Sequence, residues 1–425
     1  MSIFKSWKRG VIAALPLVVI LGGGAGLTAA TASASPTVTT INYFTYTAAP
    51  DHLKDLAAIV NAFEAQNPTI RVNVETDDYA DYFTKLSTEL AAGDAPDTFE
   101  LDYQDFVNYA ASGSLLNLGS LAKADKSWNP AFYAGSALNA FSYNGIQYGL
   151  PEDFSDVLLF FNENLFKAAH LAYPTTSWTW KQEMAAGKQL TNSSTGVWGL
   201  FQPVTFNEFY KALNQAGGQF FNASKTKAKF NSPAGVAAAE HLISKLGTTM
   251  PTLAQIGNTP NFDTNLFESG KLAMWINGNW QFAGLTKVPF KWNVVVEPGD
   301  TTKASAVFFD GVVVNAKTPN TAAAWKWVDY FTSSKVSVLR RVTSNWELAP
   351  VANTSLESSY LTATPPQNRA AVFEALKAPS LAPVITQENQ METFVNDALT
   401  NAADGSGTVA ADLNHAATQV DGLLK

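Results

Sequence analysis

The segment FESGKLAMWINGNW, residues Phe267 to Trp280, carries more structural information than any other stretch of this chain. Its first residues predict a short helix that ends at Gly270, and the apolar run that follows has the character of a strand. The Asn277-Gly278 pair then predicts a sharp turn, because glycine accepts a positive φ. We therefore expect Trp280 at the tip of a strand, which is where ligands bind in α/β proteins.

The chain on either side of this segment predicts a sheet covered by helices. The sequence predicts strands at 39–44, 70–74 and 97–101, and helical spacing predicts helices at 52–66, 79–92, 321–331 and 409–424. Strands that alternate with helices indicate a mostly parallel sheet flanked by helices. A length of 425 residues is enough for two or three units of domain size.

The N-terminus has the pattern of an export signal. Lys5, Lys8 and Arg9 precede an apolar stretch at 11–21, and Ala32-Ser33-Ala34 is a small-residue cleavage site. We expect residues 1–34 to be a signal peptide cleaved after Ala34; an uncleaved membrane anchor is the alternative. Loss of its three basic residues changes the net charge from −8 to −8 − 3 = −11, which disfavours binding to nucleic acid.

Four blocks of sequence resemble the family 1 extracellular solute-binding proteins, the maltodextrin-binding type that feeds ABC importers. The blocks lie at 63–97, at 145–162 (GIQYGLPEDFSDVLLFFN), at 175–180 and at 267–280, where F-x-x-G-K-x-A-M-x-x-x-G-x-W matches. The resemblance covers the chain from about residue 39 to the C-terminus. It implies an α/β fold of the type II periplasmic-binding-protein kind, with two α/β lobes around a ligand cleft and a hinge between them. Lobe 1 would comprise 37–153 and 311–350, and lobe 2 would comprise 154–310 and 351–425.

The resemblance also implies a function and its residues. The protein would be exported to the periplasm or the cell exterior, capture a carbohydrate without reacting with it, and deliver it to the membrane permease of an ABC importer. It would act as a monomer without cofactor or metal. Aromatic rings pack on the C–H faces of sugars and carboxylates accept their hydroxyls. The implied ligand contacts are Tyr46, Asp102, Tyr103, Gln104, Asp105, Asp153, Glu208, Tyr210, Trp275, Trp280, Gly311 and Trp346.

The chain departs from the family pattern at two points. Maltodextrin binders carry a Trp and an Asp-Arg pair where this chain has Leu101 and Gln104-Asp105, so a maltodextrin specificity does not follow. The chain has no cysteine, which excludes disulfides, thiolate metal sites and the lipid-modified Cys that tethers many Gram-positive relatives.

Two other classes of function stay open. A secreted carbohydrate hydrolase needs only two carboxylates brought together by folding, and loops rich in Asp and Glu supply candidates. A solute-binding protein for a peptide or a polyamine would use the same acidic loops for a cation. A histidine-based metal site is disfavoured, because the four histidines stand far apart and form no HExxH motif.

Overall fold

A computed structural model describes residues 37–48, 52–257, 259–346 and 348–425, and the predicted signal peptide lies outside the described residues. Residues 38–425 form one compact unit. Within the described residues, no helix combines the length and the apolarity needed to cross a lipid bilayer.

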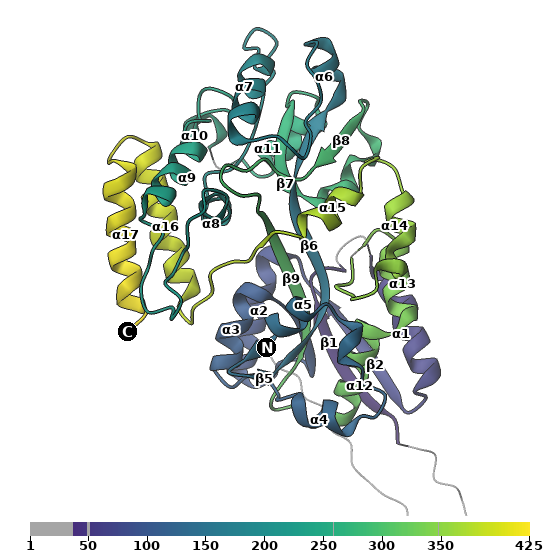
Figure 1. The fold of residues 1–425 in the computed structure, drawn as a ribbon. Coiled ribbons are helices and arrows are strands. Elements are labelled where there is room, and N and C mark those ends of the chain that lie inside the picture. The colour runs from purple at the N-terminus through teal and green to yellow at the C-terminus, as the bar shows by residue number, and fades with distance from the viewer. Residues whose placement is uncertain (1–36, 49–51, 258, 347) are drawn as a thin grey trace, which may run out of the picture. The chain divides into compact units, whose positions relative to one another are not determined.

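The unit is built from ten strands and a larger number of helices (Figure 1). The strands are β1 (Thr39–Thr45), β2 (Ile70–Thr76), β3 (Thr98–Asp102), β4 (Ser142–Tyr143), β5 (Ile146–Gln147), β6 (Gly149–Asn162), β7 (Met274–Gly278), β8 (Trp292–Val295), β9 (Ser305–Val314) and β10 (Pro379–Ser380). The α-helices are α1 (Leu53–Gln66), α2 (Tyr79–Ala92), α3 (Tyr103–Ala111), α4 (Gly119–Ala124), α5 (Gly135–Ala140), α6 (Glu163–Ala168), α7 (Trp180–Leu190), α8 (Phe206–Gln215), α9 (Pro233–Ile243), α10 (Leu253–Ile256), α11 (Phe262–Glu268), α12 (Thr321–Ser333), α13 (Lys335–Thr343), α14 (Ser358–Thr362), α15 (Ala370–Ala375), α16 (Glu388–Ala403) and α17 (Val409–Leu423). Short 3₁₀ helices occupy Pro130–Phe132, Asn279–Phe282, Gly284–Lys287 and Thr354–Glu357.

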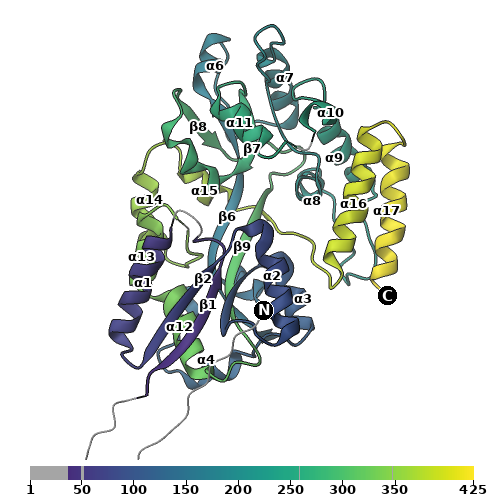
Figure 2. The same cartoon turned by 180° about the vertical axis from the view of Figure 1, so that it is seen from behind.

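The main sheet has the strand order β2-β1-β3-β9-β6-β7, with β8 also paired to β6 and β10 to β9. Among the strand pairs of the described residues, β1 with β2, β1 with β3, and β10 with β9 are parallel and the others are antiparallel, so the expectation of a mostly parallel sheet is wrong. The cause is the pair of long strands β6 and β9, which run antiparallel to each other and to their other main partners. Figure 2 shows these two strands extending together from the β1–β3 end of the sheet toward β7 and β8.

Alternation along the strands fills the cores on both faces of the sheet. At the β1 end, Tyr43 packs with α1 and α12 on one face, and Phe44 packs with α2 on the other. At the β7 end, Leu159 of β6 faces the helices α8, α9, α16 and α17, and Phe160 faces the opposite way, toward Trp275. Because side chains alternate with a period of two, one continuous strand serves two separate cores.

The segment from Phe267 to Trp280 folds partly as expected. Helix α11 ends at Glu268 and Gly270 adopts φ +71°, which marks the predicted break. The strand then continues through Gly278, whose φ is −91°, and the chain turns in a 3₁₀ helix at Asn279–Phe282. The predicted turn with positive φ at Gly278 is therefore wrong. The backbone there is extended, and the missing side chain makes room for the Trp280 ring.

Candidate functional site

A cavity of about 440 Å³ lies at the middle of β6 and β9, next to the 3₁₀ segment that follows β7. Its remaining walls come from the loop after β1, from the chain around Trp346 and from the helical region that includes Tyr360. The lining residues are Thr47, His52, Asp153, Phe154, Ser155, Asn279, Trp280, Gln281, Phe282, Ala283, Gly284, Asp310, Asn345, Trp346, Leu348, Tyr360 and Arg369. Three of the twelve residues implied by the resemblance, Asp153, Trp280 and Trp346, are among them.

Trp280 presents a large aromatic surface to this cavity. The residue is 51% exposed, whereas the other described tryptophans are buried or partly buried. The edge of its ring packs against Phe308, with the ring centroids 5.8 Å apart and an interplanar angle of 67°. The ring also lies directly over Gly278, where an added Cβ would come within 1.9 Å of a ring atom. Gly278 is thus required for the close approach of this ring, and the ring is held in place while part of it stays open.

Two carboxylates lie beside the ring on neighbouring strands. Asp153 of β6 and Asp310 of β9 are cross-strand partners, and the register of the two strands shifts between Pro151 and Asp153. Such an irregularity re-aims side chains, and here both acids line the cavity. Tyr46 donates a hydrogen bond of 2.5 Å to Asp310 Oδ1. Burial, with Asp310 as the next cause, raises the pKa of Tyr46 well above its ordinary value, so this phenol stays a donor.

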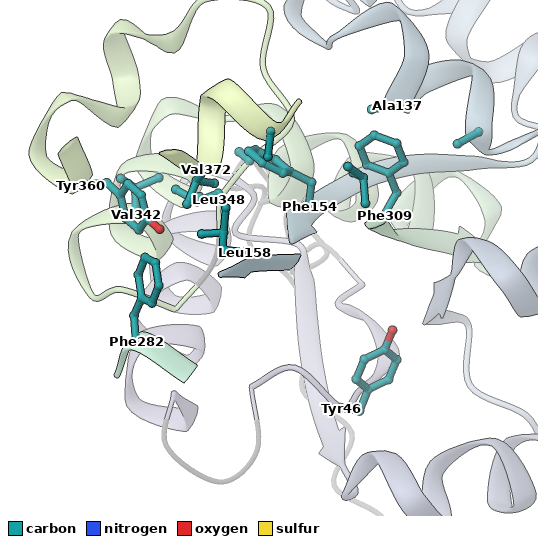
Figure 3. Packing of buried hydrophobic residues seen from close by; sticks show 14 of the residues in the cluster. Tyr46, Ala137, Phe154, Leu158, Phe282, Phe309, Val342, Leu348, Tyr360 and Val372 are labelled. Carbon is teal, nitrogen blue, oxygen red and sulfur yellow. The ribbon is translucent and has the colours of Figure 1, made fainter. Parts of the chain in front are cut away.

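Another part of the cavity wall combines two aromatic rings, Phe282 and Tyr360, with the cation of Arg369. The guanidinium carbon of Arg369 lies 4.6 Å from the ring centroid of Tyr360 and 5.3 Å from that of Phe282. Its Nη1 donates to Asn345 Oδ1 at 3.0 Å, and its Nη2 donates to the Pro365 carbonyl at 2.9 Å. Figure 3 shows Phe282 and Tyr360 one after the other on this side. These contacts fix the plane of the guanidinium against the rings.

Trp346 forms the rim near the loop after β1. Its ring is stacked on His52, with the centroids 5.5 Å apart and the planes inclined by 4°. Sequence reasoning placed Trp346 at the site but missed His52, Asp310, Tyr360 and Arg369. Asp310 could have been found, because it directly precedes Gly311, the residue chosen on the same strand.

A second group of the implied residues gathers at the N-terminus of α3. Asp102 Oδ1 accepts a hydrogen bond from the Asp105 amide and its Oδ2 accepts one from the Tyr79 hydroxyl, both at 2.8 Å. Gln104 Nε2 lies 3.4 Å from Glu388 Oε1 of α16, which belongs to the other end of the sheet. Burial, ahead of neighbouring acids, raises the pKa of Asp105 to about 7 and that of Glu388 to about 9. Tyr103 lines a separate hollow beside residues 384–387, whereas Asp102 is the cross-strand partner of Asp310, which lines the cavity next to Trp280.

Four implied residues lie in packed interior instead of at the cavity surface. Trp275 is fully buried and its Nε1 donates to Asp263 Oδ2 at 2.8 Å. Tyr210 of α8 is buried in the core. The carboxylate of Glu208, on the same helix, is 2.6 Å from the Lys211 ammonium. At Gly311, an added Cβ would meet the Phe141 ring at 2.6 Å, so the missing side chain admits a ring of the protein itself. Packing and internal pairing are the observed roles of these four residues.

The described residues contain no group of three or more His, Asp or Glu side chains arranged to hold a metal ion. The residues that line the cavity supply aromatic faces, carboxylates, amides and a guanidinium. These groups can bind a polyhydroxylated ligand through stacking and hydrogen bonds.

The family model of the bacterial extracellular solute-binding proteins matches residues 49–337. The chain belongs to this family. A solved structure of the ABC substrate-binding protein Lmo0181 from Listeria monocytogenes, in complex with cycloalternan, is 39% identical, with a TM-score of 0.86, and covers 91% of this chain and 99% of its own. A solute-binding protein of an ABC transporter from Thermotoga lettingae, bound with α-D-tagatose, is 24% identical, with a TM-score of 0.79 over 92% of this chain and all of its own. A putative binding protein of Brucella abortus is 24% identical over the full length of both chains.

These comparisons confirm the predicted fold class, which is the type II periplasmic-binding-protein fold with two α/β lobes. They also confirm the resemblance to the extracellular solute-binding family and give the chain the general role of an exported solute binder. The lobe boundaries at 153/154, 310/311 and 350/351 remain a prediction from the sequence.

Proposed function

We propose that this protein captures a carbohydrate in the cavity beside Trp280 and delivers it to the permease of an ABC importer. The observation that carries the proposal is the exposed Trp280 ring, held over Gly278 and adjacent to the cross-strand acids Asp153 and Asp310. A pyranose needs an apolar face and a set of acceptors at its edge, and this arrangement supplies both. The cycloalternan complex of the 39% identical relative supports a carbohydrate over other solutes.

Capture without chemical reaction follows from the way such a protein works. The ligand binds between two lobes and favours the closed form by its higher affinity for that form. Asp153, Trp280 and Trp346 would contact the sugar, and Tyr46 would orient Asp310. Asp102, Tyr103, Gln104 and Asp105 would belong to the part of the cleft farther from Trp280. Glu208, Tyr210, Trp275 and Gly311 would support the site through packing.

The site of action follows from the N-terminus and the family. We place the mature protein in the periplasm or at the cell exterior, with cleavage after Ala34 and no lipid-modified Cys. The mass of the exported protein tests this, since it should correspond to a chain that starts at Ser35.

A ligand screen tests the function. The purified protein is incubated with monosaccharides, linear and cyclic α-glucans, peptides and polyamines, and its melting temperature is measured. A bound ligand stabilises the native state by mass action, so a carbohydrate should raise the melting temperature in a saturable way. Chromatography of the same mixtures should show no new sugar products. Turnover of a carbohydrate would point to a hydrolase, and stabilisation by peptides or polyamines alone would reject the sugar.

A further inference from the structure

A further hollow of about 220 Å³ shares Phe154 with the cavity beside Trp280. Its lining is almost entirely apolar and consists of Ala134, Ser136, Phe154, Phe309, Ala349, Pro350, Val351, Thr354, Glu357, Phe373, Leu376, Pro379 and Leu381. Glu357 is the only titratable side chain among these described residues. The volume is below that of a typical drug-sized pocket, so it suits a smaller molecule.

Five of the thirteen lining residues lie on segments that adjoin the predicted lobe boundaries. Phe154 lies on β6, Phe309 on β9, and Ala349 to Val351 on the third connection, so each segment adjoins a predicted lobe boundary. The backbone joins them, because the Phe154 amide donates to the Leu348 carbonyl at 2.9 Å and the Ala134 amide donates to the Pro350 carbonyl at 2.7 Å. Figure 3 includes the rings of Phe154 and Phe309.

Glu357 is unusual for a carboxyl group in such surroundings. The residue is 1% exposed, and within the described structure neither of its carboxylate oxygens has a hydrogen-bond partner. Burial raises its pKa to about 8, and no neighbouring charge contributes to this shift. A buried acid without a cation is costly to ionise, and a cationic partner placed beside it offsets part of that cost.

We propose that this hollow is a binding site for a small alkylammonium ion. The alkyl chain would pack against Phe309, Phe373 and Leu376, and the ammonium group would donate to the two oxygens of Glu357. An ammonium group carries three donors, and the Thr354 hydroxyl can accept the third. A site with one carboxylate in an apolar lining fits a ligand with one positive charge and an apolar chain, and an alkylammonium ion has both.

This site is independent of the carbohydrate proposal, because it needs no sugar in the cavity beside Trp280. Occupancy would nevertheless couple the two cavities through Phe154, since an occupant packs on segments that move when lobes close.

The test is a titration of the full chain with n-butylammonium chloride, followed by calorimetry and by methyl NMR of Val351, Leu376 and Leu381. Potassium chloride at the same ionic strength and 1-butanol, a neutral molecule of similar size, serve as controls. We expect saturable binding that shifts these three methyl signals and releases protons at pH 7, because the bound cation favours ionised Glu357. The affinity should rise toward pH 9, where the carboxyl ionises and the alkylammonium is still protonated.

Two variants make the result decisive. Glu357→Gln keeps the shape but removes the charge, and should weaken n-butylammonium binding at least about tenfold and abolish the proton release. Glu374→Gln removes an exposed acid that lies outside the lining of the hollow, and this variant should bind n-butylammonium as the wild type does. The proposal is overturned by undiminished binding to Glu357→Gln, by 1-butanol binding as tightly as the cation, by unshifted signals of the three methyl groups, or by no saturable binding up to about 10 mM.

Discussion

The cavity beside Trp280 and the interior around Lys211 use charged and aromatic residues in opposite ways. In the interior, the Lys211 ammonium is fully buried, 2.6 Å from the Glu208 carboxylate and 2.7 Å from that of Glu297. In the cavity, Asp153 and Arg369 line an open volume beside an exposed ring. The Lys211 ammonium is paired within the protein by two carboxylates, and the cavity group is placed to meet a ligand. The first should therefore govern stability and the second affinity.

The largest expected effect is on the interior. Lys211→Met leaves Glu208 and Glu297 buried without their cation, and loss of one partner from a buried ion pair costs about 3–5 kcal/mol. Chemical denaturation of the purified variant measures this loss of free energy of unfolding. Although burial opposes the charge, the two glutamates raise the pKa of Lys211 above its ordinary value, so the ammonium is charged in the wild type.

A matched control exists on α15 and the loop after it. Lys377 and Glu374 have the same spacing of three residues and an N–O distance of 2.5 Å, but the lysine side chain is 71% exposed. Lys377→Met should change the free energy of unfolding by less than about 1 kcal/mol, because solvent screens an exposed pair. Equal losses from the two variants would remove burial as the reason for the difference.

The next largest effect is expected on the affinity for the carbohydrate bound in the cavity. Trp280→Ala removes the stacking surface and should weaken binding of the carbohydrate found in the screen by at least about tenfold, which corresponds to about 1.4 kcal/mol. Its melting temperature without ligand should stay close to that of the wild type, since the ring is half exposed. Calorimetry gives both the affinity and the stoichiometry.

Trp275, five residues earlier, provides the contrast for this variant. Its ring packs 5.1 Å from Phe267 and 5.4 Å from Phe160, centroid to centroid. Trp275→Ala should destabilise the fold by about 3–5 kcal/mol through loss of core packing. If Trp280→Ala bound sugar as the wild type does, Trp280 would not belong to the ligand site.

The sequence predicted the elements of the first lobe well, because strands such as Thr39–Thr45 and helices such as Tyr79–Ala92 have clear periodicity. It placed Trp280 at the tip of a strand, but it also gave Trp275 as a ligand contact, which the structure buries in the core. Residue Trp275 lies inside the β7 ladder opposite Phe160, and Trp280 follows the end of that strand. The sequence also could not separate Glu208 from Asp153. Lys211, three residues after Glu208, is a local partner, but Glu297 is brought to 2.7 Å from the Lys211 ammonium only by the tertiary structure. Residues such as Arg369 were missed because neither a motif nor a spacing links them to Trp280.

The smallest effect concerns the glycine beneath the ring. Gly278 has φ −91° and ψ 162°, which alanine adopts without strain, so Gly278→Ala should leave the backbone intact. The three atoms nearest to the added methyl all belong to the Trp280 ring, so the ring must move from its place over residue 278. Because the ring can still contact a sugar from a shifted position, we expect a loss of affinity of only about two- to fivefold, measured by calorimetry. Gly422→Ala, where nothing lies within 4 Å of the new Cβ, is the matched control and should bind normally. If the position of the ring matters for binding, Gly278→Ala should lower the affinity and Gly422→Ala should not. In the double variant of Gly278→Ala with Trp280→Ala, the glycine change should lower the affinity no further than Trp280→Ala alone.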